Sequence, residues 1–188
     1  AYEELMYRFD ADARRDTSVY YTPSHIAEYM VAEAFHGHPD GSHARVLDPA
    51  CGAGVFLVAA FRKLAELRFV ETGQRPDRSA LRGMLNNQLV GFDINSHART
   101  LAALALYLTA LELDPAPAPV EALIFEKLEG RVLVDVADPG SDPTIIRPMA
   151  GSLGKHVPDA YRNVFGLVVG NPPWTSLKPT YKAIDQIF

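Results

Sequence analysis

The residues with the clearest chemical potential form the tetrapeptide Asn171-Pro172-Pro173-Trp174. Two prolines fix the backbone and remove two N–H donors, so carbonyl oxygens and the Asn171 amide oxygen remain as hydrogen-bond acceptors. An exocyclic base amine is a poor nucleophile because its lone pair is delocalised into the ring. Two acceptors that hold the hydrogens of such an –NH2 group favour a tetrahedral nitrogen whose lone pair can attack a methyl group. We therefore expect these residues to bind an amine and to activate it for methylation.

Trp174 would supply a flat face on which a base can stack. Stacking of this kind contributes on the order of 1–3 kcal/mol, which partly offsets the few kcal/mol needed to extrude a base from duplex DNA. The alternative is a proline-rich turn with Trp174 in the core. Because Trp174 is the only tryptophan and directly follows two prolines, we favour stacking.

A second group of residues is typical of a nucleoside site. A short apolar run ends at Asp48 and leads into the small-residue turn Ala50-Cys51-Gly52-Ala53-Gly54, followed by a predicted helix over 55–70. Glycines in such a turn let a ligand approach backbone N–H groups and the helix N-terminus. Glycines that only close a tight turn would give the same pattern.

Asp93 ends another apolar run, where a carboxylate can accept hydrogen bonds from both ribose hydroxyls of a nucleoside. Its alternative role is to cap the next helix, which Asn95 or Ser96 could do instead. Asp93 lies 45 positions after Asp48, whereas about 20 residues separate the glycine turn from the acid in a dinucleotide-binding unit. Residues 71–87 therefore resemble an insertion, and NAD is less favoured as a ligand.

The elements that position these residues alternate between apolar strands and helices. This alternation predicts an α/β, Rossmann-like domain with a mostly parallel sheet and helices on both faces. Ligands of such sheets bind at the carboxyl ends of the strands, where the pattern also places Asp48, Asp93, Asp135 and Asn171. The expected strands cover 44–48, 88–93, 131–135 and 164–170, and the expected helices cover 1–16, 23–35, 55–70 and 96–113.

Prolines mark two of the expected boundaries. Thr22 is the predicted N-cap of the helix over 23–35, with Pro23 at its first helical position. The proline-rich run 114–119 ends the helix that precedes it, because proline cannot continue a helix.

Composition is that of one ordinary globular domain. Of the 188 residues 48% are hydrophobic, and the longest uncharged apolar stretch, residues 101–111, is far shorter than the roughly 20 residues of a membrane-spanning helix. A single cysteine excludes an internal disulfide and fits a reducing compartment. We therefore expect a cytoplasmic protein without a membrane partner.

The net charge is −5, whereas proteins that grip DNA neutralise its phosphates with Lys and Arg. Either the DNA-gripping surface lies in other sequence or in a partner, or the substrate is not a long polyanion. The chain begins Ala-Tyr-Glu-Glu, without an initiator Met or a signal-peptide pattern. We expect it to be part of a longer protein.

With these motifs described, the chain resembles the adenine-N6 DNA methyltransferases of restriction–modification and related defence systems, in the order where cofactor motifs precede the catalytic one. Most of the chain takes part in this resemblance. The sequence from Val46 to Leu57 is similar to the family's cofactor loop, Gly91 to Ile94 to its ribose and adenine contact, and Asn171 to Trp174 to its catalytic tetrapeptide. Tyr21-Thr22-Pro23 is similar to the motif that contacts the methionine part of the cofactor.

The resemblance implies S-adenosylmethionine as the cofactor and a domain truncated after the fourth strand. It divides the chain into a helical segment with the Tyr-Thr-Pro motif, 1–40, and an incomplete methyltransferase core, 41–188, that lacks the target-recognition region. The implied catalytic residues are Asn171, Pro172, Pro173 and Trp174. The implied cofactor-binding residues are Tyr21, Thr22, Pro23, Asp48, Ala50, Cys51, Gly52, Gly54, Phe56, Asp93, Ile94, Asp135 and Asn171.

Several positions depart from the family pattern or leave a choice open. Asp135 resembles the acid that contacts the adenine amine of the cofactor, but Asp138 competes with it. Trp174 replaces the more usual Tyr or Phe, which preserves stacking and removes a hydroxyl. The resemblance gives Cys51 a packing role and not that of a nucleophile.

Three histidines in a polar loop, His36, His38 and His43, are the nearest approach to a metal cluster. A polar loop without a nearby cysteine or acid pair is more often plain surface. We therefore predict no metal site.

The expected function is direct methyl transfer from S-adenosylmethionine to the N6 amine of a flipped-out adenine in DNA, in a restriction–modification or phage-defence system. DNA would be bound through a region outside this chain, with a specificity or nuclease subunit or domain as a further partner. The alternatives are methylation of a protein glutamine amide or of a ribosomal RNA amine, or a non-catalytic module that binds the cofactor or a partner subunit.

Overall fold

Residues 22–119, 123–136, 159–161 and 163–172 are the part of the chain that the computed structural model describes. All of them belong to one unit, Thr22–Pro172, and a second unit comprises Ala1–Tyr21 and Pro173–Phe188. The helix expected over 1–16 therefore lies outside the described residues, as do Tyr21, Asp138, Pro173 and Trp174.

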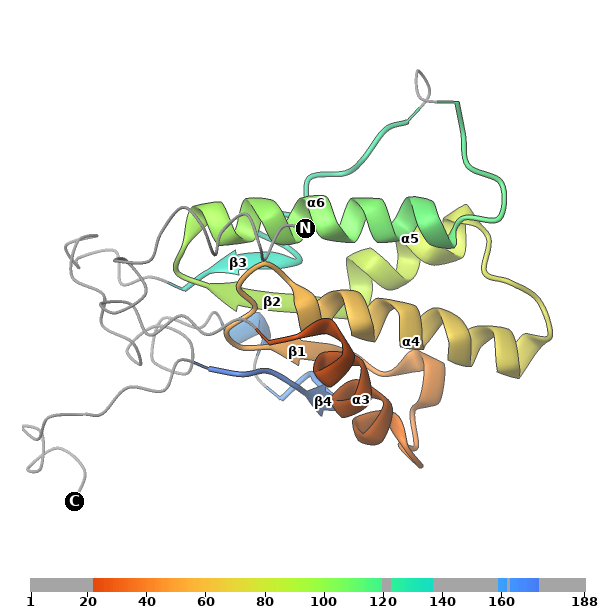
Figure 1. The fold of residues 1–188 in the computed structure, drawn as a ribbon, viewed down its shortest axis with the longest axis horizontal. Coiled ribbons are helices and arrows are strands. Elements are labelled where there is room, and N and C mark those ends of the chain that lie inside the picture. Colours follow the sequence, from red (N-terminus) through yellow and green to blue (C-terminus); the bar gives the residue numbers. More distant parts are fainter. Residues whose placement is uncertain (1–21, 120–122, 137–158, 162, 173–188) are drawn as a thin grey trace, which may run out of the picture. The chain divides into compact units, whose positions relative to one another are not determined.

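A sheet of four strands lies at the centre of this unit, in the order β3-β2-β1-β4 (Figure 1). The strands are β1 (Val46–Asp48), β2 (Leu89–Asp93), β3 (Leu133–Asp135) and β4 (Leu167–Val168). Every pairing is parallel, and Val46 of β1 lies opposite Leu89 on one side and Leu167 on the other. The parallel sheet predicted from the sequence is confirmed, with each strand shorter than expected.

The strand order changes direction at β1. β2 and β3 follow one another on one side of β1, whereas β4 lies on its other side. In open α/β sheets, ligands bind outside the carboxyl ends of the two strands that flank such a reversal. Here those ends lead to Asp48 from β1 and to Asn171 from β4.

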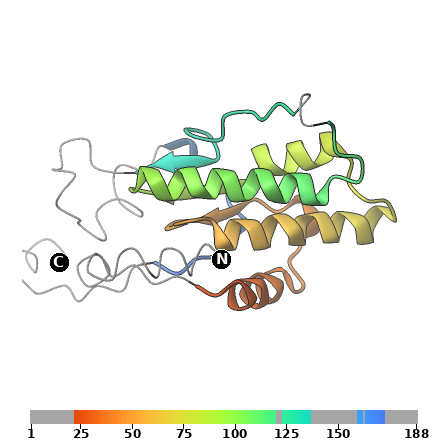
Figure 2. The same cartoon turned by 45° about the horizontal axis from the view of Figure 1, so that its top comes forward.

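Four helices of the described residues pack on one face of the sheet. They are α3 (Ser24–Phe35), α4 (Val55–Thr72), α5 (Arg78–Asn87) and α6 (Ser96–Leu113). α4 and α6 run along the sheet, with α3 beside α4 and α5 next to α6 (Figures 1 and 2). Their buried side chains form one core with Val46, Leu89 and Leu133 of the strands.

The opposite face of the sheet carries a smaller core. It is formed by Leu47, Val90, Phe92, Val134 and Val136, packed against Tyr161 and Phe165. Successive strand residues point to opposite faces, which explains why neighbours in β1 belong to different cores. Tyr161 ends the short 3-10 helix η3 (Asp159–Tyr161).

The start of α6 agrees with the sequence prediction. The Asn95 side-chain oxygen accepts hydrogen bonds from the N–H groups of His97 and Ala98, at 2.9 and 3.2 Å, and so caps the helix. None of the helices in the described part of the chain is long and apolar enough to cross a membrane.

The predicted N-cap of α3 was wrong. Pro23, and not Thr22, is the capping residue, and its carbonyl oxygen accepts from the N–H groups of Ile26 and Ala27. The Thr22 hydroxyl instead accepts a hydrogen bond from Asn171. The helix begins one residue later than predicted, which moves the cap position from Thr22 to Pro23.

Residues 71–87 contain a helix that the sequence analysis missed. Asp77 is the N-cap of α5, and its side chain accepts from the N–H of Ala80 at 2.8 Å. Its apolar side, with Leu81 and Leu85, is buried in the main core. Gly83 and two terminal asparagines weaken the helical signal of this segment, so tertiary packing decides its conformation.

Candidate active site

The glycine turn between β1 and α4 is held by hydrogen bonds of its backbone N–H groups, two of them to the end of β2. Gly52 and Gly54 have φ angles of 51° and 87°, which disfavour any other residue. The N–H groups of Cys51, Gly52 and Gly54 donate to Phe92, Asp93 and Cys51, respectively. These three donors are bonded within the protein, and the ligand contacts predicted for the turn stay predictions.

Asp48 ends β1 and is almost fully buried, with 1% of its surface exposed. Its Oδ1 accepts from the N–H of Ala50 at 3.1 Å, whereas its Oδ2 has no hydrogen-bond partner among the described residues. Burial raises the pKa of the carboxyl from 3.8 to about 7, and the negative charge of Asp93 adds to the rise. A buried acceptor without a donor is unfavourable unless a ligand supplies that donor.

Asp93 ends β2 and connects two loops at the edge of the sheet. Its Oδ2 accepts from the N–H of Gly52 and its Oδ1 accepts from the N–H of Asn95, both at 2.8 Å. The carboxylate therefore ties the glycine turn to the start of α6. A carboxylate has about four acceptor positions, so these two bonds leave capacity for the predicted ribose contact.

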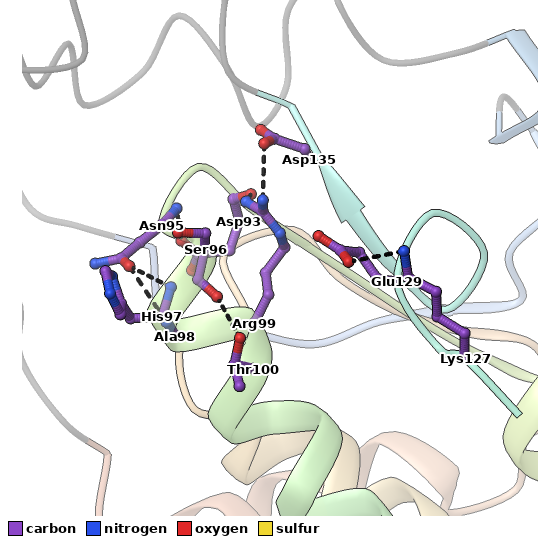
Figure 3. A network of polar contacts seen from close by, with 10 residues as sticks. All are labelled: Asp93, Asn95, Ser96, His97, Ala98, Arg99, Thr100, Lys127, Glu129 and Asp135. Atoms are coloured by element: carbon purple, nitrogen blue, oxygen red, sulfur yellow. Dashed lines mark hydrogen bonds and ion pairs between the residues drawn. The ribbon is translucent and has the colours of Figure 1, made fainter. Parts of the chain in front are cut away.

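Arg99 of α6 links the ends of β2 and β3, and the sequence analysis did not single it out. One terminal nitrogen of its guanidinium donates to the Asp93 carbonyl oxygen and the other to Oδ2 of Asp135, both at 2.7 Å (Figure 3). The Arg99 side chain is 5% exposed and that of Asp135 is 52% exposed. An arginine four residues after the cap Asn95, in a helix that is otherwise rich in Ala and Leu, is the signal that could have revealed this role, because a charge on such a helix needs a partner.

Other predicted cofactor residues are involved in packing. The thiol of Cys51 lies against Gly91, where a Cβ would come within 2.8 Å of Sγ. Burial raises the pKa of this thiol well above its ordinary value, and the charges of Asp48 and Asp93 raise it further. Phe56 is 2% exposed in the main core, whereas Ile94 is 41% exposed at the rim. Their cofactor contacts stay predictions.

Asn171 follows β4 and lies beside Thr22, the first residue of the described unit. Its Nδ2 donates to Oγ1 of Thr22 at 3.2 Å. Gly170 lies so close to β1 that a Cβ there would come within 2.7 Å of Oδ1 of Asp48. The structure thus brings Thr22, Asp48 and Asn171 to the reversal point of the sheet, while Pro173 and Trp174 lie outside the described residues.

The histidines of the polar loop do not converge. Nδ1 of His38 accepts from the N–H of Asp40 at 3.2 Å, which leaves Nε2 to donate to the carbonyl oxygen of Gly166 at 3.1 Å. His38 therefore helps to hold the loop next to β4. Among the described residues, no three His, Cys, Asp or Glu side chains are grouped as metal ligands would be.

A hollow that is open to solvent lies away from all of these residues. It is lined by α5, by the second half of α6 and by the segment 123–128, with Leu81, Tyr107 and Phe125 among its walls. α5 leads into the amino end of β2. The hollow is therefore on the side of the sheet away from the strand ends that carry the polar groups.

Comparison with known proteins places this arrangement in a family. The sequence matches the family model of the N-6 DNA methylases over residues 1–186. The adenine-specific methyltransferase PglX of Streptomyces coelicolor (strain ATCC BAA-471 / A3(2) / M145) is 24% identical over 198 residues, which cover 94% of this chain and 16% of PglX.

A solved structure supports the fold. The cryoEM structure of a DrdV–DNA complex superimposes with a TM-score of 0.56 and 17% sequence identity, over 98% of this chain and 18% of the DrdV chain. This chain therefore spans less than a fifth of the length of both relatives. On the strength of the family match along nearly its whole length, the chain belongs to the N-6 DNA methylase family.

Proposed function

We propose that this chain carries the cofactor-binding and amine-activating part of a DNA methyltransferase that modifies the N6 amine of adenine. The observation that carries the proposal is the junction at the reversal of the sheet, where Gly170 lets the end of β4 lie against Asp48 and delivers Asn171 beside it. Methyl transfer needs the donor and the acceptor amine in one place. The predicted cofactor end of β1 and the predicted amine-binding end of β4 are neighbours.

S-adenosylmethionine fits the chemistry of the described residues. The ammonium group, ribose hydroxyls and adenine amine of this cofactor are hydrogen-bond donors, and Asp48, Asp93 and Asp135 provide carboxylates at the ends of three adjacent strands. The unpartnered Oδ2 of Asp48 is a buried acceptor of the kind that a cation would satisfy. When bound, the cofactor supplies a methyl group on a positively charged sulfur.

In this proposal the chain's own residues bind and orient the target amine. The amide oxygen of Asn171 and the carbonyl oxygen of Pro172 accept the two amine hydrogens. The nitrogen then becomes tetrahedral, and its lone pair is no longer delocalised into the ring. Trp174 stacks on the base. Cys51 takes no part in the chemistry, because its neutral thiol is buried behind the turn.

Modification of a glutamine amide or of a ribosomal RNA amine is the competing function, since the same acceptors would serve it. The family is that of the N-6 DNA methylases, and its relative PglX is an adenine-specific methyltransferase; both favour adenine in DNA as the substrate. The target-binding region, any nuclease or specificity partner and a cytoplasmic location belong to the same proposal for the longer protein.

Sequencing of DNA from cells that express the full-length protein tests the substrate, the base and the residue together. We expect N6-methyladenine at defined sites with the wild-type protein and a loss on the order of 100-fold with Asn171→Ala, as when one preorganised hydrogen-bonding group is removed from an active site. Asn87→Ala is the matched control, because Asn87 is exposed at the end of α5.

Two results would contradict the proposal. One is adenine methylation that persists at the wild-type level with Asn171→Ala. The other is unmodified DNA together with an Asn171-dependent methyl group on a protein or on ribosomal RNA, which would identify the competing function.

A further inference from the structure

The hydrogen bond between Thr22 and Asn171 joins residues 149 positions apart. Thr22 lies two residues before the first residue of α3, and the carbonyl of Pro23 between them accepts from the N–H groups of Ile26 and Ala27. The backbone next to Thr22 is therefore fixed by a regular helix. Its hydroxyl makes no capping contact with α3, so helix formation does not explain why a hydroxyl is present here.

In this bond the Nδ2 edge of the Asn171 amide lies against the Thr22 hydroxyl. The amide group is planar and carries a donor nitrogen and an acceptor oxygen on opposite sides. Because Nδ2 donates to Thr22, Oδ1 lies on the opposite edge of the planar amide, away from the hydroxyl. If the amide were rotated by half a turn, its N–H groups would take the place of that acceptor.

We propose that Thr22 is a positioning residue, whose hydroxyl holds the Asn171 side chain in the place where its amide oxygen can accept from the substrate amine. The inference rests on the function proposed above. An amine that is to be methylated offers two N–H donors, so it is bound by Oδ1 and repelled by the N–H groups of a rotated amide. The bond to Thr22, at a backbone position next to α3, restricts where the Asn171 amide can lie and so favours the placement that the transfer needs.

This role is distinct from the contact with the methionine part of the cofactor that the sequence resemblance implies for the same motif. A contact with the cofactor changes the affinity for S-adenosylmethionine. Orientation of Asn171 changes the rate of transfer once both substrates are bound. The two roles therefore separate into the dissociation constant of the cofactor and kcat.

The test compares Thr22→Val with Thr22→Ser in the full-length protein. Valine keeps the shape of threonine and removes the hydroxyl, whereas serine keeps the hydroxyl. The substrate is enzymatically amplified genomic DNA, which carries no methylated bases, and methyl incorporation gives kcat and KM. Calorimetry with S-adenosylmethionine gives the dissociation constant of the cofactor without turnover.

We expect Thr22→Val to lower kcat about tenfold, the effect of losing one hydrogen bond of ordinary strength, while the dissociation constant of S-adenosylmethionine changes less than about twofold. Thr22→Ser should restore most of the lost rate. An unchanged kcat with weakened cofactor binding in Thr22→Val would overturn the inference, and so would equal losses of kcat in both variants. Failure of the proposed function is seen separately, as a wild-type protein that does not methylate adenine or an Asn171→Ala variant that equals the wild type.

Discussion

The acids at the strand ends differ in how many hydrogen bonds the fold provides to their carboxyl groups. Asp93 accepts two backbone hydrogen bonds and braces the glycine turn, which gives it a structural role in addition to the one proposed for the cofactor. Asp48 is buried, with one oxygen unpartnered among the described residues. Of these two acids, Asp48 is therefore the one whose environment a ligand would change most.

The stability of the chain should depend on pH through Asp48. An unfolded aspartate releases its proton near 3.8, whereas Asp48 in the folded chain keeps it up to about 7. Between these values the folded state binds more protons, so the free energy of unfolding falls as the pH rises. The full effect is on the order of 4 kcal/mol and should disappear in Asp48→Asn, as urea unfolding at about pH 4 and about pH 8 would measure.

The affinity for the cofactor should depend on pH in the opposite direction to the free energy of unfolding. An ammonium group beside Asp48 favours the charged carboxylate, so the affinity for S-adenosylmethionine should rise with pH up to about 7 and should not do so in Asp48→Asn. Glu33→Gln, at an exposed position of α3, is the control for a general effect of charge. Equal pH profiles of Asp48→Asn and the wild type, in unfolding and in calorimetry, would remove Asp48 from both roles.

At the scale of elements, the sequence predicts most of what the structure describes. Apolar runs of strand length and helical runs with clear caps, such as the Asn95 cap of α6, are encoded locally and were predicted correctly. α5 was missed because its helical signal is weak and its burial depends on α4 and α6. The cap of α3 was assigned incorrectly because the helix begins at Ser24, one residue after the predicted start, which puts Pro23 at the cap position.

The candidate site shows the same division between local and distant information. The sequence alone placed Asp48, Asp93 and Asp135 at strand ends, because each closes its own apolar run. Their neighbours could not be predicted in this way. Contacts such as Arg99 with Asp135 and Thr22 with Asn171 depend on the order of strands in the sheet, which the local pattern does not determine.

Arg99 gives a prediction about how α6 joins two strands. Arg99→Met removes both hydrogen bonds of the guanidinium and leaves the Asp93 carbonyl and Asp135 without this donor. We expect a loss of stability on the order of 2 kcal/mol, because the arginine is buried but Asp135 is half exposed and partly screened by solvent. Asp135→Asn should therefore lower the free energy of unfolding less than Arg99→Met does. Urea unfolding of each variant measures this difference.

The matched control for Arg99→Met is Arg82→Met, at an exposed position of α5 where one hydrogen bond to the Ile124 carbonyl is lost. Its effect should stay below that of Arg99→Met. If Arg99→Met unfolds with the free energy of the wild type, the guanidinium does not hold β2 and β3 together.

For the molecule as a whole, charge limits what this chain does alone. It has 18 Lys and Arg against 23 Asp and Glu, and several basic side chains on the described helices are paired with acids, as in Arg62–Glu112, Lys63–Glu66 and Arg78–Asp114. Paired cations are less available to phosphates. The PglX and DrdV chains are more than five times as long as the part that matches here, so there is ample sequence in such proteins to bind DNA.

Because the 188-residue chain carries more acidic than basic side chains, we expect this chain, tested by itself, to bind DNA poorly and to methylate it at an undetectable rate. Binding that depends on phosphate contacts weakens steeply with salt, because each contact releases counterions. With a labelled random-sequence duplex, we expect a dissociation constant above about 10⁻⁴ M and little change in fluorescence anisotropy between about 50 and about 200 mM salt. The full-length protein should bind more tightly and with a steep salt dependence. Tight, salt-sensitive binding or sequence-specific methylation by the 188-residue chain would show instead that its own surface grips DNA, and the assignment of that task to other sequence would be wrong.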